Sequence, residues 1–218
     1  MKYLLKQRHT WTWLGLCAHL FFASAWAAPS VNASSPEQLV TTLSQSVIAE
    51  LNQNRTRYLD SPQAVKDFAD AYVLPYVDTY RMARYVMGRH WRLASDSQKD
   101  AFSEAFEHML LRSYARSLLK LEIESVSISQ VTETRPGRAS VQSEVRQADG
   151  NASRVDYRAY FNEQASQWQL YDMTVEGVSL LLNYRKTYAS EFSRKGVGRV
   201  INELQEKNAQ ALQTGDAA

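Results

Sequence analysis

The sequence predicts an α+β protein in which a four-stranded antiparallel sheet packs against a layer of helices. Up to about residue 119, and again after residue 178, apolar residues recur every three or four positions, which is the period of a helix. Between residues 121 and 175 they alternate with polar residues, which is the period of a strand. Helices gathered on one face of an antiparallel sheet bury both apolar surfaces, so the two patterns together indicate the α+β class.

Four helices are expected before the sheet. Ser35 and Ser61 can cap the first two, and the proline that follows each serine fits a first helical turn. Gln38 would complete a capping box with Ser35. Pro75 ends the second helix. The third helix is expected from about residue 78 to residue 88, and the fourth and longest from Ser95 to about residue 119.

Turn-forming residues divide the middle region into four strands that connect as a meander. The turns fall at residues 136–137, 149–151 and 163–166, which are rich in Pro, Gly, Asn and Asp or in polar residues. The apolar alternation changes phase early in the first strand, so we expect a bulge near Ser125. Helical sequence resumes at Val178 and continues to about residue 211, with an interruption at Gly196 to Gly198.

The N-terminus is expected to be a cleaved signal peptide. Residues 1–27 have a basic start, a short apolar stretch and small residues at the end, with cleavage expected after Ala27 or, as an alternative, after Ala25. An uncleaved anchor is the remaining alternative. Cys17 is preceded by Leu16 where a lipoprotein signal needs a small residue, so no lipid attachment is expected there. The expected organisation is then a linker at 28–35, one domain at 36–211 and a flexible tail at 212–218.

Charge and cysteine content exclude several classes of protein. The chain has 25 Lys and Arg residues and 23 Asp and Glu residues. Residues 1–27 hold three of the bases and none of the acids, which leaves 22 against 23 after cleavage. No concentrated basic footprint remains, so a nucleic-acid partner is not expected. The single cysteine lies in the leader, so the exported chain must be stable without a disulfide.

No catalytic or metal-binding pattern is present, so the protein is not expected to be an enzyme or to carry a metal or cofactor. His90 and His108 are the histidines left after residue 27, and neither has the spacing of a metal-ligand pair. Gly177-Val178-Ser179 is not a nucleophile elbow, because Leu181 stands where a second glycine is needed. Asp172 and Glu176 are expected to accept hydrogen bonds from backbone groups at the turn before the last helices.

Several blocks along the chain resemble the MlaC family. Residues 78–92 fit its pattern Asp-x-x-Arg-Met-Ala-x-x-Val-x-Gly-x-x-Trp-Arg, and Gln98 then opens a helix with the family's spaced aromatics. A strand that starts at Trp168 passes through Glu-Gly-Val-Ser at residues 176–179 into an apolar helix. The resemblance extends from about residue 36 to residue 208. Tyr188 and Gly198 depart from it, standing where a phenylalanine and an aspartate are expected.

The resemblance implies a periplasmic lipid-transfer protein with an apolar lipid cavity. Such proteins carry phospholipid between an outer-membrane lipoprotein complex and an inner-membrane ABC transporter complex with its membrane-anchored substrate-binding subunit. They maintain outer-membrane lipid asymmetry and are linked to toluene tolerance. The residues expected to line the cavity are Val73, Met82, Tyr85, Val86, Phe102, Phe106, Met109, Leu110, Tyr157, Phe161, Tyr171, Met173, Val175, Val178 and Leu181.

Two alternatives stay open from the sequence. A relative could carry a hopanoid or another lipid in the same cavity, or the chain could be a periplasmic adaptor with a solid core and no lipid. Within the leading interpretation, the long fourth helix faces the strand of Tyr157 and Phe161 across the cavity. Met109 and Val86 are expected at its wall, so Met109→Trp would displace lipid without destabilising the lipid-free protein.

Overall fold

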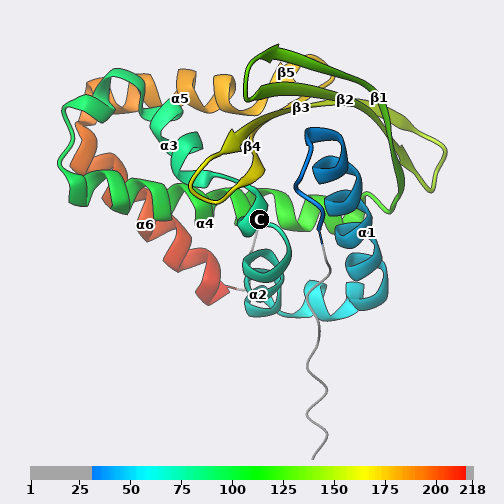
Figure 1. Cartoon of the computed structure of the whole chain (residues 1–218). Coiled ribbons are helices and arrows are strands. Elements are labelled where there is room, and N and C mark those ends of the chain that lie inside the picture. Colours follow the sequence, from blue (N-terminus) through cyan, green and yellow to red (C-terminus); the bar gives the residue numbers. More distant parts are fainter. Residues whose placement is uncertain (1–30, 215–218) are drawn as a thin grey trace, which may run out of the picture.

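The computed structural model describes residues 31–214, and within them a curved antiparallel sheet lies over a layer of helices (Figure 1). The predicted signal peptide at 1–27 lies outside the described residues. The helices are α1 (Pro36–Asp60), α2 (Pro62–Tyr72), α3 (Thr79–Met87), α4 (Asp96–Lys120), α5 (Leu180–Lys195) and α6 (Val197–Thr214), with short 3-10 turns η1 (Leu74–Tyr76) and η2 (Gly88–Arg92). The strands are β1 (Ile123–Arg135), β2 (Arg138–Gln147), β3 (Ala152–Asn162), β4 (Gln167–Val175) and β5 (Val178–Ser179).

The sheet has the predicted meander, with one more strand than expected. Its order is β1-β2-β3-β4-β5, and every neighbouring pair is antiparallel. The extra strand, β5, has two residues, which is too short for an alternating pattern to show in the sequence. Glu176 and Gly177 have φ angles of 47° and 82°, so the turn between β4 and β5 is of the two-residue hairpin type that needs positive φ. The predicted bulge near Ser125 is confirmed by a register shift between Ile123 and Ser125.

The predicted starts of the first, second and fourth helices are confirmed, because capping is a local interaction. The side chains of Ser35, Ser61 and Ser95 each accept a hydrogen bond from the backbone N–H three residues later. A full capping box forms at Ser95, where the side chain of Gln98 accepts from the Ser95 N–H. The box expected at Ser35 does not form, since the side-chain oxygen of Gln38 accepts from the hydroxyl of Ser34 instead.

The last helical region begins at Leu180 and not at Val178, because Val178 and Ser179 pair with β4, but it divides as predicted. Gly196 has a φ of 81° and ends α5, where its N–H bonds the carbonyl of Phe192. Helix α6 then continues to Thr214, three residues beyond the end at residue 211 that the sequence suggested. Because α6 packs mainly against α4, it closes the helical layer on the side away from the sheet (Figure 1).

Buried apolar residues form separate clusters on either side of the molecule. One cluster joins α3, α4, α5 and α6 around the stacked rings of Phe102 and Phe106. A second joins the first half of α1 to the concave face of the sheet around Leu39 and Val141. A third, smaller cluster ties the second half of α1 to α2 and the end of α4. The space between these clusters is where a cavity can persist.

Candidate functional site

An apolar cavity of about 320 Å³ lies between the concave face of the sheet and helices α1, α2 and α4. The sheet contributes side chains from β1 to β4, such as Val126, Val145 and Tyr157. On the helical side, the cavity is lined by the inner faces of α1 and α2, with Val47 and Phe68 among their residues, and by the sheet-facing side of α4. Aliphatic and aromatic side chains make most of this wall, so its chemistry suits a hydrocarbon ligand.

The polar groups in the wall have partners within the protein. The hydroxyl of Thr79 donates to Glu107 Oε2 at 2.6 Å, which joins α3 to α4 at the cavity edge. Tyr114 and Tyr184 share a hydrogen bond between their hydroxyls at 3.2 Å. Burial raises the pKa of the Tyr157 phenol, so this wall residue stays neutral at physiological pH. The cavity therefore presents carbon surface and few free polar groups.

Asp172 fixes the junction between the sheet and α5 at the end of the cavity. Its buried carboxylate accepts from the N–H of Leu181 at 3.2 Å and from the hydroxyl of Ser179 at 3.0 Å. It also accepts from the N–H of Met173 at 2.9 Å. Arg158 Nη1 lies 3.8 Å from the same carboxylate. A negative group at the start of α5 is favoured by the helix dipole, so these contacts hold the helix in register with β4.

Glu176 has a similar role at the neighbouring turn. Its side chain accepts from the N–H of Arg154 at 2.6 Å. The prediction that Asp172 and Glu176 satisfy backbone groups around this turn is therefore confirmed.

The cavity-lining residues predicted from the sequence fall into three groups. Those that line the cavity are Val73, Met82, Leu110, Tyr157, Tyr171 and Met173. Those that are buried in the cluster around Phe102 and Phe106, away from the cavity, are Val86, Phe102, Phe106, Met109 and Leu181. Those that are exposed at the surface are Tyr85, Phe161, Val175 and Val178.

Helix geometry explains the second group. Successive residues of an α-helix are rotated by about 100°, so Leu110 and Met109 point to different neighbours. Leu110 lines the cavity, whereas Met109 is 6% exposed and packs among α3, α5 and α6. The strand β3 also holds one predicted residue that lines the cavity and one that does not. Tyr157 lines the cavity, whereas Phe161, four residues further along β3, is exposed beside Trp168.

The sequence interpretation missed the contribution of α1 and α2. None of the expected cavity residues lies on α1, yet Leu43, Val47 and Ile48 line the cavity. Val65 and Phe68 of α2 do the same. The helical period signals that these residues face inward, but it does not say whether a side chain or an open space lies opposite.

A larger depression of about 860 Å³ lies at the far ends of the hairpins and is open and polar. Asp78, Arg81, Arg138 and Tyr160 are among its lining residues, and the Arg81 guanidinium stacks 3.6 Å from the centre of the Tyr160 ring. An open, polar depression cannot shield hydrocarbon from water. The smaller apolar cavity is therefore the candidate functional site.

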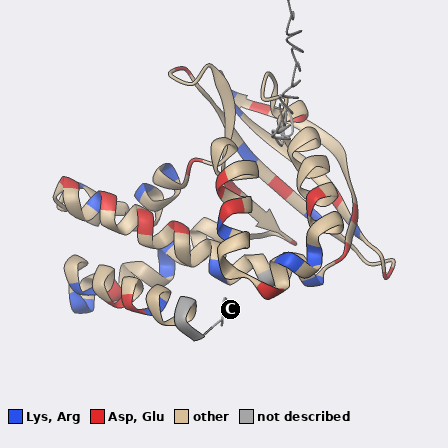
Figure 2. Ribbon diagram, turned by 90° about the horizontal axis from the view of Figure 1, so that it is seen from below, with Lys and Arg blue, Asp and Glu red and all other residues tan. Residues whose placement is uncertain are grey.

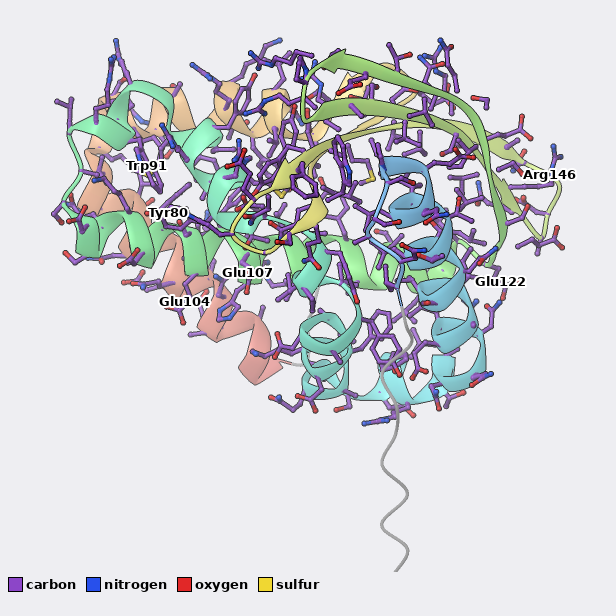
Figure 3. All side chains as sticks on the ribbon, viewed as in Figure 1. Tyr80, Trp91, Glu104, Glu107, Glu122 and Arg146 are labelled. Carbon is purple, nitrogen blue, oxygen red and sulfur yellow. The ribbon has the colours of Figure 1, made fainter. Side chains whose placement is uncertain are left out.

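The arginine-rich block at the end of α3 lies away from this cavity. Tyr80 and Trp91 meet edge to face there at 5.0 Å (Figure 3). His90 packs on Phe192, and its pKa is lowered by burial and by the neighbouring Arg89. Residues of both charge signs are interspersed along the helices (Figure 2), so charge does not single out one surface. Within residues 31–214, no group of three His, Cys, Asp or Glu side chains is placed to hold a metal ion.

The fold and the cavity define a class: a small α+β protein with an apolar cavity between a curved antiparallel sheet and helices. None of the described helices is both long enough and apolar enough to cross a membrane. Residues 41–206 match the model of the MlaC protein family, and the chain belongs to that family.

Curated and solved relatives agree with this assignment. The chain is 20% identical to the intermembrane phospholipid transport system binding protein MlaC of Haemophilus influenzae, over 92% of this chain and 94% of that protein. It is 23% identical to the toluene tolerance protein ttg2D of Pseudomonas putida, over 90% and 92% of the two chains. A solved phospholipid-binding protein from Ralstonia solanacearum, in complex with a phospholipid, superposes with a TM-score of 0.71 at 26% identity, covering 78% of this chain and 94% of that one.

Proposed function

We propose that this protein is a periplasmic lipid-transfer protein that binds phospholipid in the cavity beneath the sheet. It carries the lipid between an outer-membrane lipoprotein complex and an inner-membrane ABC transporter complex with a membrane-anchored subunit, and so maintains outer-membrane lipid asymmetry. The observation that carries the proposal is the apolar cavity, whose polar side chains are paired within the protein. The solved relative with its phospholipid and the curated relatives support it.

The residues proposed to contact the acyl chains are the predicted ones that line the cavity together with those of α1 and α2. Leu110, Met82 and Tyr171 represent the helical and strand walls on either side. No catalytic group is needed for this work, since loading and release change no covalent bond. The expected leader at residues 1–27 supports a periplasmic location.

The energetics explain why a carrier of this kind must enclose its cargo. Exposing hydrocarbon to water costs about 0.8 kcal/mol per CH₂. For two chains of about sixteen carbons, the same coefficient gives roughly 25 kcal/mol. A soluble protein can carry such a molecule through water only if most of that surface is covered, and the cavity between the sheet and the helices offers apolar surface for that contact.

Lipid transfer between membranes tests the proposal. Donor vesicles bearing the outer-membrane complex and acceptor vesicles bearing the ABC transporter complex are mixed with labelled phospholipid and the protein. We expect the protein to accelerate phospholipid transfer, and to do so only when both complexes are present. A protein that binds the complexes but moves no lipid would be an adaptor, and selective movement of a hopanoid would change the cargo.

A further inference from the structure

The open polar depression brings together residues from three parts of the chain. The β1–β2 turn contributes Arg138, the β3–β4 turn contributes Glu163, and the segment that begins α3 contributes Asp78 and Arg81. Both turns lie at the same end of the sheet, because β1–β2 and β3–β4 are alternate hairpins of one meander (Figure 1). The residues that line the depression are not among those that line the cavity beneath the sheet.

Two arginines of the depression meet at one pair of tyrosine rings. Arg81 Cζ lies 3.6 Å from the centre of the Tyr160 ring, and Arg138 Cζ lies 5.9 Å from the same centre. The distances from these two atoms to the centre of the Tyr171 ring are 6.0 Å and 5.7 Å. Like charges held this near each other repel. An anion bound beside both guanidinium groups would relieve that repulsion.

The carboxylate of Asp78 balances Arg81 and leaves Arg138 without an acidic partner. Asp78 accepts from the Arg81 backbone N–H at 2.7 Å, from Arg81 Nε at 3.3 Å, and from the hydroxyl of Tyr160. Arg138 is half-buried, and its guanidinium has no hydrogen bond or ion pair within residues 31–214. Glu163 is exposed on the rim and forms no ion pair with either arginine. The fork of Arg138 is therefore free for a carboxylate, which it matches in shape.

An aromatic pair adjoins these charges. Phe161 and Trp168 line the depression and meet edge to face at 5.9 Å. The Phe161 side chain is 38% exposed, so it offers apolar surface to a second molecule. Arginine and aromatic residues are enriched in the parts of protein interfaces that supply most of the binding energy.

The floor of the depression is held in place by side-chain hydrogen bonds. Gln167 and Gln169 both donate to the carbonyl of Pro75, at 3.0 Å and 3.2 Å, which ties the start of β4 to η1. Asn162 donates to Gln169 Oε1 at 2.7 Å and accepts from the N–H of Gln164 at 3.1 Å. A surface arranged in advance loses little conformational freedom when a partner binds.

We propose that the depression is a docking site for a segment of a partner protein that carries a carboxylate side chain next to an apolar one. The carboxylate binds Arg138 beside Arg81, and the apolar side chain packs on Phe161 and Trp168. A lipid head group would use the arginines and leave the aromatic pair bare, so a peptide segment matches more of this surface. The proposal rests on the proposed function and deepens it, because a carrier has to engage the complexes that load and unload it.

The docking site lies next to one wall of the lipid cavity. The ring of Tyr171 lies near both guanidinium groups, and Tyr171 also lines the cavity. A partner held at Arg138 is therefore placed beside the space from which lipid enters or leaves.

Charge variants test the proposal through binding to the purified inner-membrane and outer-membrane complexes, each measured by surface plasmon resonance. Arg138→Glu reverses the unpaired cation, and Glu163→Gln removes the anion on the same rim. Arg146→Glu is the matched control: Arg146 is exposed at the other end of β2, where it pairs with Glu144 (Figure 3). Phospholipid occupancy of each folded variant is followed by native mass spectrometry.

The expected results differ in sign. Arg138→Glu should weaken binding to at least one complex by about tenfold or more, because it places like charges in contact. Glu163→Gln should strengthen the same binding, and Arg146→Glu should match the parent. Phe161→Ala should also weaken it, whereas Val131→Ala, at a similarly exposed position of β1, should not. Phospholipid occupancy should stay at the parental level in every variant.

Two results with Arg138→Glu overturn the proposal. One is unchanged binding to both complexes by the folded variant. The other is loss of phospholipid with partner binding intact, which would assign the depression to the lipid head group. If Arg138→Glu does not fold, Arg138→Gln is judged by the same criteria. A parent that binds neither complex contradicts the proposed function as well.

Discussion

Replacing Leu110 with tryptophan is expected to expel lipid from the cavity while the lipid-free protein keeps near-parental stability. Leu110 is partly buried and lines the cavity, so the larger side chain extends into open space. Overpacking a filled core costs typically about 1–3 kcal/mol, but a wall residue has room for added bulk. Lipid occupancy by mass spectrometry and urea unfolding of the delipidated protein measure the two effects separately.

Met109→Trp is the matched control, one residue away on the same helix. Met109 is 6% exposed and packs among α3, α5 and α6, so the added ring has to displace core side chains. We expect this variant to lose about 1–3 kcal/mol of unfolding free energy, while its folded fraction still binds lipid. This differs from the sequence-based expectation for Met109. Loss of lipid from a fully stable Met109→Trp protein would mean that the cavity lies on the other face of α4.

Replacing Asp172 with alanine is expected to be the most destabilising change at the sheet–helix junction. Its carboxylate accepts from the N–H of Leu181 and the hydroxyl of Ser179, and the residue is 5% exposed. Removing it leaves buried donors unpaired next to the start of α5. Hydrogen bonds to charged groups are each worth about 1.5–3 kcal/mol, so we expect a loss of about 3 kcal/mol in urea unfolding.

Two further variants define the origin of that loss. Asp172→Asn keeps one acceptor oxygen and should lose about half as much free energy, on the order of 1–2 kcal/mol. Glu176→Ala removes an exposed acceptor of the Arg154 N–H and should cost no more than about 1 kcal/mol. Equal losses for Asp172→Ala and Glu176→Ala would show that burial of Asp172 does not matter.

Local interactions made the helices and most strands predictable from the sequence. Ser61 and Ser95 cap helices through contacts within three residues, and the phase change near Ser125 shows in the alternation itself. Strand β5 was not predictable, because two residues carry no period and the strand forms only by pairing with β4. The fold class was predicted from the spacing of apolar residues and from the turn residues. Both features depend only on residues that are close together in the sequence.

The cavity wall was less predictable, because a core residue and a wall residue have the same chemistry. Phe106 and Leu110 lie four apart on α4 and both face inward in the sequence pattern. Phe106 meets Phe102 and Tyr184, whereas Leu110 also borders a space that no side chain fills. Which of them faces a space depends on how α5 and the sheet pack against α4, and this is set by contacts far apart in the chain.

Native mass spectrometry of the protein released gently from the periplasm tests the central claim most directly. The account predicts a species whose mass is that of the mature chain plus one two-chain phospholipid, identified after extraction of the same sample. The Leu110→Trp protein, prepared in parallel, should appear mainly lipid-free. Parent protein that is entirely lipid-free under these conditions, with no phospholipid in its extract, would contradict the account.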